Sequence, residues 1–386
     1  MKKVCVITGT RAEYGLLKPL LRKIDDEREV LLQLVVTGMH LSPEFGLTYR
    51  EIEQDGFGIA DRNEMLLSSD TPNGITKSTG LGMIGFADIF TRLVPDMVVI
   101  LGDRYEAFAA AAAAMIHRIP IAHIHGGELT LGAVDDSFRH SITKMSTLHF
   151  ASTEIYRRRI IQLGESPERV FCVGALGVEN IKTQKLMSKD ELAESIGFSF
   201  DKPYLMVTFH PVTLERNTAK EQFENLLQAF EEFQEYRIMF TKANADTDGR
   251  IINQMIDNYV AENGDKARAY TSLGMERYLS ALGYCEMVIG NSSSGILEAP
   301  SFHIPTVNIG NRQDGRVRGK SVIDCGCSAE EIAGAIRVAQ EMNRNGVLQN
   351  EPGPYEGEHT SENILKIMKE HLTEGMSVRK RFYDLA

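Results

Sequence analysis

The segment VCVITGTR, residues 4–11, sets the fold of this chain. Its first four residues are apolar, a threonine and a glycine turn follow, and residues 12–24 then have the apolar spacing of a helix. A strand without in–out alternation is typical of a sheet that helices cover on both faces. This strand–turn–helix unit therefore predicts a parallel α/β domain.

The same unit recurs in two series along the chain. We expect strands at 4–8, 32–37, 97–101, 119–124, 148–151 and 170–173, and again at 204–209, 237–241, 267–270, 287–289 and 306–309. Helical patterns lie between them, among them 42–54 and 295–299. We predict two doubly wound, Rossmann-like domains facing a central cleft, residues 1–177 and 178–360, with a last helical segment at about 361–386.

Composition excludes several classes of protein. The chain has 386 residues, and 42 Lys and Arg against 53 Asp and Glu give a net charge of −11. Non-specific nucleic-acid binding needs a basic face, so we do not expect it. No apolar run approaches the roughly 18 residues of a membrane span. Five cysteines without disulfide or zinc spacing, and a short N-terminal apolar run, are typical of a cytoplasmic protein with free thiols.

Acidic residues follow neighbouring strands in the first half, where ligands of α/β sheets bind. Asp103 follows the strand 97–101, and Glu128 and Asp136 follow the strand 119–124. Three carboxylates at neighbouring strand ends suit acid/base catalysis, because mutual repulsion and burial tune their pKa values. A plainer role stays open: Asp103, and either Asp135 or Asp136, could cap the helix that follows.

Metal binding is a second alternative for this region. His123, His125 and Glu128 are residue types that bind metal ions, but we expect no metal.

A calcium site is also considered in the second half of the chain. The loop 244–249 resembles the start of a calcium-binding loop, yet the twelfth position of that loop is Met255, where an acidic ligand is required.

The second half has the features of an anion site. The run GNSSSGILE, residues 290–298, takes a strand into a serine-rich turn that opens a helix, where N–H groups and hydroxyls can bind a phosphate. Ser292, Ser293 and Ser294 are the candidates, and Glu298 is placed to take ribose hydroxyls. An N-cap serine with a first-turn glutamate is the alternative.

Further candidates for this anion site lie at other strand ends. His210 and Asn244 each follow a strand, and Arg11 opens the first helix. Arg312 begins the stretch 311–320, which has four positive charges against one negative. Neither the dinucleotide-binding G-x-G-x-x-G pattern nor the P-loop pattern follows the first strand, so we expect no such cofactor.

Together these motifs resemble one enzyme family over almost the whole chain. They are GTRAEYG at 9–15, GDR at 102–104, HIHGGE at 123–128, Asp136 with Arg139 and His140, FHP at 209–211, NSSSG at 291–295 and GNRQ at 310–313. The sequence is similar to the hydrolysing UDP-N-acetylglucosamine 2-epimerases of sialic-acid biosynthesis. The resemblance implies the two-domain GT-B fold, a C-terminal helix that folds back on the first domain, no metal or redox cofactor, and a homodimer or homotetramer.

The resemblance also implies a reaction. UDP-N-acetylglucosamine would lose UDP by anti elimination, and hydration of 2-acetamidoglucal would give N-acetylmannosamine. The expected catalytic residues are Asp103, Glu128, Asp136 and His210, and the expected substrate-binding residues are Arg11, Arg104, Arg139, Asn244, Ser292, Ser293, Ser294, Glu298 and Arg312. Alternatives are the sister enzyme acting on UDP-2,4-diacetamido-2,4,6-trideoxyhexose, a GT-B glycosyltransferase, and a nucleotide-binding module without catalysis.

Overall fold

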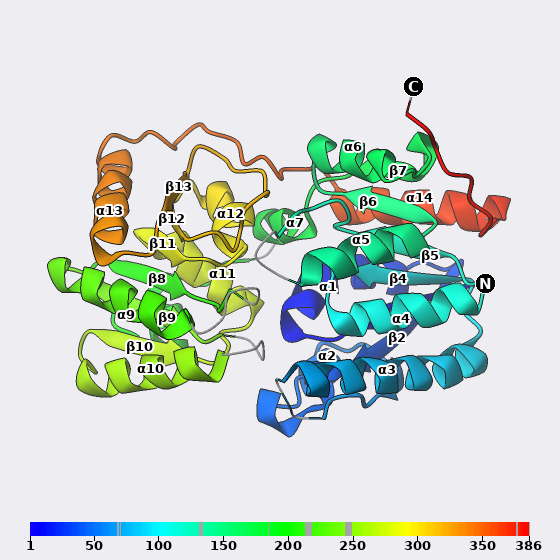
Figure 1. Cartoon of the computed structure of the whole chain (residues 1–386), viewed down its shortest axis with the longest axis horizontal. Coiled ribbons are helices and arrows are strands. Elements are labelled where there is room, and N and C mark those ends of the chain that lie inside the picture. The colour runs from blue at the N-terminus through cyan, green and yellow to red at the C-terminus, as the bar shows by residue number, and fades with distance from the viewer. Residues whose placement is uncertain are drawn as a thin grey trace. The chain divides into compact units, whose positions relative to one another are not determined.

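The chain divides into two compact units (Figure 1). The computed structural model describes residues 1–67, 69, 71–130, 134–183, 185–212, 218–243, 249–375 and 377–385. Unit 1 comprises Met1–Glu128, Asp135–Asn180 and Tyr355–Ala386, and unit 2 comprises Leu129–Val134 and Ile181–Pro354. The main change of unit lies a few residues after position 177, and the chain rejoins unit 1 before the last helix.

Unit 1 is built on a parallel sheet of seven strands in the order β3-β2-β1-β4-β5-β6-β7. The strands are β1 Lys2–Thr8, β2 Val30–Thr37, β3 Ile59–Asn63, β4 Met97–Leu101, β5 Ile121–Ile124, β6 Leu148–Ala151 and β7 Val170–Cys172. The strand order reverses between β1 and β4, which is the switch point where such sheets bind ligands.

Unit 2 repeats this plan with six parallel strands in the order β10-β9-β8-β11-β12-β13. They are β8 Tyr204–Thr208, β9 Arg237–Thr241, β10 Ala267–Tyr270, β11 Met287–Gly290, β12 Thr306–Ile309 and β13 Val322–Cys325. Its switch point lies between β8 and β11. Both units therefore have the doubly wound architecture that the sequence predicts.

Helices cover both faces of each sheet. The helices of the first part of the chain are α1 Arg11–Asp25, α2 Tyr49–Gln54, α3 Pro72–Leu93, α4 Tyr105–Ile116, α5 Asp135–Met145, α6 Glu154–Gln162 and α7 Leu176–Thr183. The others are α8 Lys189–Ile196, α9 Ala219–Ala229, α10 Gly249–Glu262, α11 Met275–Tyr284, α12 Ser294–Leu297, α13 Ala329–Arg344 and α14 Thr360–Glu374. Capping boxes at Thr10–Glu13, Ser188–Glu191 and Ser328–Glu331 fix the starts of α1, α8 and α13.

The first strand shows why the apolar run at its centre is continuous. Val4 and Val6 pack in one hydrophobic cluster with residues of α1 and α14, whereas Cys5 and Ile7 pack in another with residues of α3 and α4. Successive side chains point to opposite faces of a sheet, so both sets must be apolar when both faces are covered. All four side chains are at most 5% exposed.

Three sequence predictions need correction. Residues 42–54 are not one helix, because a 3-10 turn at Pro43–Phe45 and Gly46, with a φ of +84°, precede the short α2. The helix expected at 295–299 is the four-residue α12. The strands β3 and β13 were not predicted, since each lies at a sheet edge and is partly exposed, so neither is a continuous apolar run.

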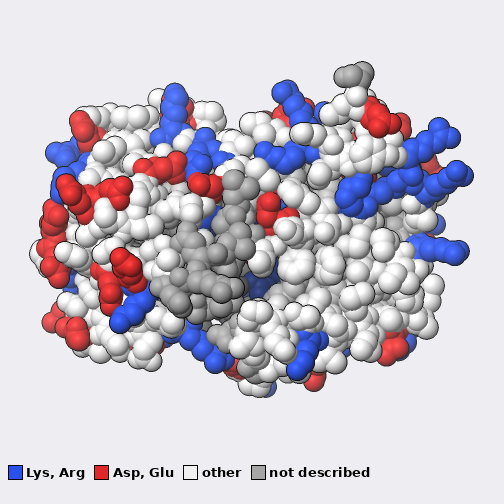
Figure 2. Space-filling model, viewed as in Figure 1, with Lys and Arg blue, Asp and Glu red and all other residues white. Residues whose placement is uncertain are grey.

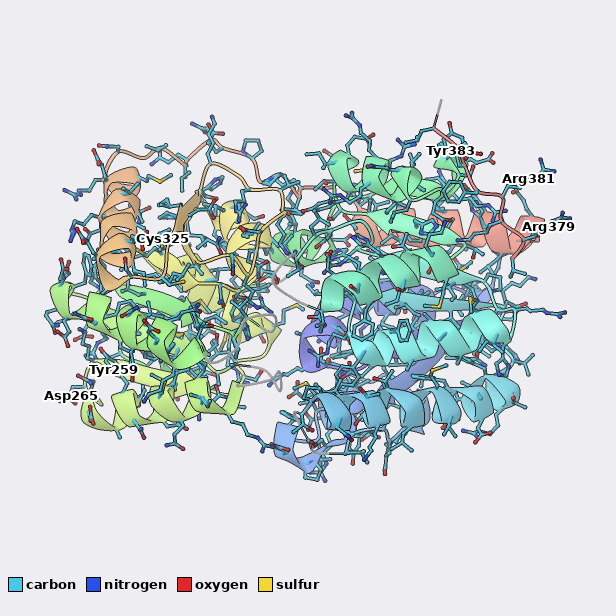
Figure 3. The ribbon with its side chains drawn as sticks, viewed as in Figure 1. Tyr259, Asp265, Cys325, Arg379, Arg381 and Tyr383 are labelled. Atoms are coloured by element: carbon cyan, nitrogen blue, oxygen red, sulfur yellow. The ribbon has the colours of Figure 1, made fainter. Side chains whose placement is uncertain are left out.

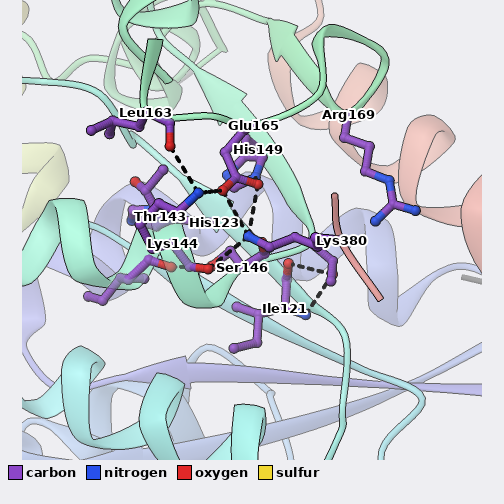
Figure 4. Close-up of polar contacts among 12 residues, drawn as sticks. Ile121, His123, Thr143, Lys144, Ser146, His149, Leu163, Glu165, Arg169 and Lys380 are labelled. Carbon is purple, nitrogen blue, oxygen red and sulfur yellow. Dashed lines mark hydrogen bonds and ion pairs between the residues drawn. The ribbon is translucent and has the colours of Figure 1, made fainter. Parts of the chain in front are cut away.

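The C-terminal segment belongs to unit 1. Residues Ile364, Leu365 and Met368 of α14 join the hydrophobic cluster that contains α1. Beyond the helix, the Lys380 ammonium reaches the buried carboxylate of Glu165 at 2.8 Å (Figure 4). Burial alone would raise the pKa of Glu165, but hydrogen bonds from His149, Lys144 and Lys380 outweigh it and hold that pKa at about 2. The tail is therefore tied to unit 1 by an ionic contact as well as by the helix.

Charge on the surface is mixed. Figure 2 shows acidic and basic side chains interspersed over the visible face. Basic side chains gather at the C-terminal tail, where Arg379 and Arg381 are exposed (Figure 3). Within the part of the chain that the structure describes, no helix has both the length and the apolar character needed to cross a bilayer.

Candidate active site

The turn after β4 places the first predicted carboxylate. Gly102 has a φ of +81°, a conformation that suits glycine, and Asp103 and Arg104 follow it. The Asp103 carboxylate forms an ion pair with the guanidinium of Arg139, from α5. Asp103 is not the helix cap, because Arg104 occupies the N-cap position of α4 and makes no side-chain capping bond.

Arg139 brings the predicted acidic residues together. Its side chain is 2% exposed, and Nη1 donates to Asp136 Oδ1 at 3.2 Å and to the carbonyl oxygen of Glu128 at 3.0 Å. One buried guanidinium thus holds the carboxylates of Asp103 and Asp136 and the backbone of Glu128. Asp135 and Asp136 both lie in the first turn of α5.

The Glu128 side chain is almost fully buried and hydrogen-bonded. Its Oε1 accepts a hydrogen bond from Ser152 Oγ at 2.9 Å, and His125 Nδ1 lies 3.5 Å away. Asp136 also has a histidine near it, because His140 Nε2 lies 3.6 Å from Asp136 Oδ2. Burial lowers the pKa of His140, and Asp136 opposes that effect. Each of these two acids therefore has an imidazole beside it.

His123 and His125 contact different groups. The Nε2 atom of His123 lies 2.8 Å from the carbonyl oxygen of Gly102, and its Nδ1 lies 3.2 Å from Thr143 Oγ1. Burial lowers the pKa of His123 to about 3, so the ring is neutral and supports the turn before Asp103. Among the described residues, no group of three His, Cys, Asp or Glu side chains is placed to hold a metal ion.

The two other arginines predicted in this unit each contact a carboxylate. Arg11 opens α1 and pairs with Glu51 at 2.8 Å, and Arg104 Nε pairs with Glu106 Oε2 at 3.2 Å. Glu106 was not among the predicted site residues. Its only signal in the sequence is a glutamate in a first helical turn, which is also what a helix dipole favours.

In unit 2, an asparagine joins the two strand ends of the switch point. The backbone N–H of His210 donates to Asn291 Oδ1 at 2.7 Å, and Asn291 Nδ2 donates to the carbonyl oxygen of His210 at 2.8 Å. Asn291 is 1% exposed and was not predicted as a site residue. Arg312 Nη1 and Gln313 Nε2 both donate to its carbonyl oxygen, at 3.1 and 2.7 Å. The predicted His210 and Arg312 are therefore brought together through Asn291.

The serine-rich turn is only in part the predicted helix start. Ser293 is the N-cap of the short α12 but makes no side-chain capping bond, and Ser292 Oγ accepts from the backbone N–H of Ser294 at 3.4 Å. Ser294 Oγ is hydrogen-bonded to both Tyr278 and Glu298. Burial raises the pKa of Glu298, which lies just after α12 rather than inside it.

Two further predictions concern the stretch 311–320 and Asn244. The positive charge of the stretch 311–320 is partly neutralised within unit 2, because Arg318 pairs with Asp314 at 3.1 Å and with Asp324 at 3.0 Å. Asn244 lies outside the described residues.

Comparisons with known proteins give the family. A family model described as UDP-N-acetylglucosamine 2-epimerase matches residues 22–369. The chain is 45% identical, over 84% of each chain, to GDP/UDP-N,N'-diacetylbacillosamine 2-epimerase (hydrolyzing) of Campylobacter jejuni subsp. jejuni serotype O:2. It is 41% identical, over 100% of this chain and 98% of the relative, to polysialic acid biosynthesis protein P7 of Escherichia coli.

A solved structure agrees in fold. The crystal structure of Methanocaldococcus jannaschii UDP-GlcNAc 2-epimerase in complex with UDP-GlcNAc and UDP matches with a TM-score of 0.79 at 20% identity, covering 95% of this chain and 99% of that one. The family model matches most of the chain, and two relatives are more than 40% identical to it. The chain therefore belongs to the UDP-N-acetylglucosamine 2-epimerase family and is a UDP-sugar 2-epimerase.

Proposed function

We propose that this enzyme is a hydrolysing 2-epimerase that converts UDP-N-acetylglucosamine and water to N-acetylmannosamine and UDP. One observation carries the proposal: the carboxylates of Asp103 and Asp136 share the buried guanidinium of Arg139, which also holds the backbone of Glu128. A group of acids fixed at the carboxyl edge of a sheet suits proton transfer at a sugar carbon.

The first step is an elimination. A carboxylate removes the proton from C2 of the sugar, the electron pair forms the C1–C2 double bond, and the C1–O bond to UDP breaks. The products of this step are 2-acetamidoglucal and UDP. The C2 proton is weakly acidic, so the departing diphosphate needs strong stabilisation, and preorganised cations and N–H donors can supply several kcal/mol of it.

The second step is a hydration. Water gives a proton to one carboxylate as its oxygen bonds to C1, and a protonated carboxyl group gives its proton to C2. C2 takes this proton on the face opposite to the one it lost, which inverts C2. Two faces of one carbon exchange protons, so more than one acid/base group is required. We assign this work to Asp103, Glu128 and Asp136, with Arg139 fixing the two aspartates.

The nucleotide is assigned to groups that carry positive charge or donate hydrogen bonds. We propose that the diphosphate contacts Arg11, His210, Ser292, Ser293 and Arg312, and that Glu298 binds the ribose. The coupling of His210 and Arg312 through Asn291 supports a common ligand for the two. Arg104 is assigned to the sugar, and Asn244 and Ser294 to the nucleotide region.

A second substrate is favoured by two relatives, which are 45% and 36% identical to this chain and are both named as N,N'-diacetylbacillosamine 2-epimerases. The 45% identity to the diacetylbacillosamine enzyme supports a UDP-2,4-diacetamido-2,4,6-trideoxyhexose, whereas the 41% identity to the polysialic acid protein extends over the full chain and supports UDP-N-acetylglucosamine. Both substrates undergo the same chemistry at C1 and C2. They differ at C4, which is an acetamido group in one and a hydroxyl in the other, and at C6.

Proton NMR of the reaction in deuterated water tests the proposal. With UDP-N-acetylglucosamine we expect free UDP and N-acetylmannosamine carrying deuterium at C2. Preferential turnover of the diacetamido substrate would assign the enzyme to the second reaction. A UDP-sugar product that keeps its diphosphate would contradict the hydrolysing type, whereas UDP release without exchange at C2 would contradict the elimination.

A further inference from the structure

Glu106 is a buried carboxylate at the start of the helix that follows Asp103. Its side chain is 1% exposed, and Oε2 accepts a hydrogen bond from Arg104 Nε at 3.2 Å. The other oxygen, Oε1, has no hydrogen-bond partner within the described part of the chain. A buried charge is costly unless it is paired, so a carboxylate at this place requires an explanation.

The surrounding backbone makes room for this side chain. A Cβ atom at Gly38, where φ is +56°, would lie 2.9 Å from Glu106 Oε1. A Cβ atom at Gly9 would lie 3.3 Å from the Cβ atom of Glu106. Glycines just after β1 and β2 therefore allow the glutamate to lie at the switch point of unit 1. An apolar side chain would occupy this space without the cost of removing a charge from water.

Few positively charged groups lie near the Glu106 carboxylate. Glu13 lies next to it and accepts hydrogen bonds from the backbone N–H groups of Gly9 at 2.7 Å and Thr10 at 3.2 Å. Burial and the charge of Glu106 raise the pKa of Glu13 to about 7. The pKa of His40, which is bonded to Thr8, is lowered by burial to about 4, so this ring adds no charge near neutral pH. Arg104 is the cation bonded to Glu106.

We propose that Glu106 is a positioning residue for the epimerase reaction, and that its carboxylate fixes the Arg104 guanidinium on the turn that carries Asp103. The inference rests on the proposed function. Arginine has a long side chain with several rotatable bonds, and ordering it in advance removes an entropic cost from the reaction step. A guanidinium held beside Asp103 can stabilise charge that develops on the sugar–diphosphate as the C1–O bond breaks. Glu106 acts through Arg104 and needs no contact with substrate.

The first test compares two Glu→Gln variants. Glu106→Gln keeps the shape of the side chain and removes its charge. Glu53→Gln is the matched control, because Glu53 pairs with Arg62 at 2.7 Å on the exposed surface of the same unit. With UDP release as the assay, we expect Glu106→Gln to lower kcat about 10- to 100-fold with KM within about threefold, and Glu53→Gln to change neither. A wild-type kcat for Glu106→Gln would overturn the proposal.

A double-mutant cycle shows whether Glu106 works through Arg104. In an Arg104→Ala background, Glu106→Gln should lower kcat no further, because the group to be positioned is gone. Losses that multiply would mean that Glu106 acts independently, and would overturn the proposal. Circular dichroism and thermal unfolding verify that each variant folds.

A conservative variant keeps the test open if Glu106→Gln does not fold. Glu106→Asp retains the charge but is one methylene shorter, so we expect its kcat to lie between those of Glu106→Gln and the wild type, with KM unchanged. An unchanged kcat in Glu106→Asp would then count against the proposal. If the wild type releases no UDP from either substrate, the proposed function is wrong; if it does and the Glu106 variants match it, only the positioning role is wrong.

Discussion

At the carboxyl edge of the unit 1 sheet a buried guanidinium holds acidic groups together, whereas in unit 2 an uncharged amide joins two strand ends. Arg139 contacts Asp103, Asp136 and the backbone of Glu128, while Asn291 contacts the backbone of His210. The first arrangement depends on charge and the second on neutral hydrogen bonds. The same doubly wound topology therefore supports two different arrangements at its strand ends, and we propose that the first serves proton transfer and the second binds the diphosphate.

Removing one acid from unit 1 should have the largest effect on activity. Asp103→Asn and Asp136→Asn each keep the size of the side chain and remove a charge that faces Arg139. We expect kcat to fall about 10³-fold, the range of general acid–base catalysis, with UDP affinity within about threefold. Single-turnover UDP release and calorimetric UDP titration measure the two. If kcat and UDP affinity fell by the same factor, the assignment of proton transfer to unit 1 and of UDP binding to unit 2 would be contradicted.

Removing the guanidinium tests the same site through stability. Arg139→Met leaves two carboxylates without their shared cation. A fully buried pair broken in this way costs about 3–5 kcal/mol, and because the aspartates are each about one-fifth exposed we expect about 2–3 kcal/mol of unfolding free energy. Chemical denaturation measures it. The control Arg62→Met breaks an exposed pair and should cost less than about 1 kcal/mol.

A change in unit 2 should affect binding more than chemistry. Arg312→Ala removes a cation that is hydrogen-bonded to the Asn291 carbonyl oxygen. We expect the Kd for UDP to rise about tenfold, equivalent to about 1.4 kcal/mol, with kcat at saturating substrate changed less than threefold. Isothermal titration with UDP and steady-state kinetics separate the two quantities. If Arg312→Ala lowered kcat as much as Asp103→Asn does, the proposal that unit 2 acts mainly in binding would be contradicted.

The smallest predicted effect is a pH dependence of stability. The pKa of Glu13 is about 7 in the folded chain and near 4.5 when unfolded, so the folded state retains a proton between these values. The contribution of Glu13 is therefore complete below about pH 4.5 and is lost as pH rises to 7. Glu13 is partly exposed, so we expect about 1 kcal/mol. In urea titrations between pH 5 and pH 8, the unfolding free energy of the wild type should fall by this amount relative to that of Glu13→Gln. If the two proteins showed the same dependence of unfolding free energy on pH, the raised pKa of Glu13 would be contradicted.

The sequence predicts the fold well where burial is symmetric. The central strands are apolar on both faces and are found where expected, for example β4 and β11. The edge strands β7 and β10 are also found where expected, whereas β3 and β13 are not predicted. In β3, Ile59–Asn63, exposed residues alternate with more buried ones and two side chains are charged. A strand that alternates in this way and contains charged residues is harder to recognise in a sequence than a continuous apolar run.

For the site, the sequence predicts the three acids and their partner Arg139, but not Asn291 or Glu106. Asp103, Glu128 and Asp136 follow strands and stand out by type. Asn291 and Glu106 do not, because an asparagine in a turn and a glutamate in a first helical turn are common for local reasons. Their roles in this structure come from burial and from contacts with residues far apart in the chain, which no local pattern contains.

The return of the chain to unit 1 has a consequence for synthesis. The helix α14 contributes to the same hydrophobic cluster as β1 and α1, yet it leaves the ribosome after all of unit 2. During translation the first sheet must wait, with part of its apolar face uncovered, until all of unit 2 has emerged. Nascent chains generally fold domain by domain from the N-terminus, so here the second unit can reach its native packing before the first.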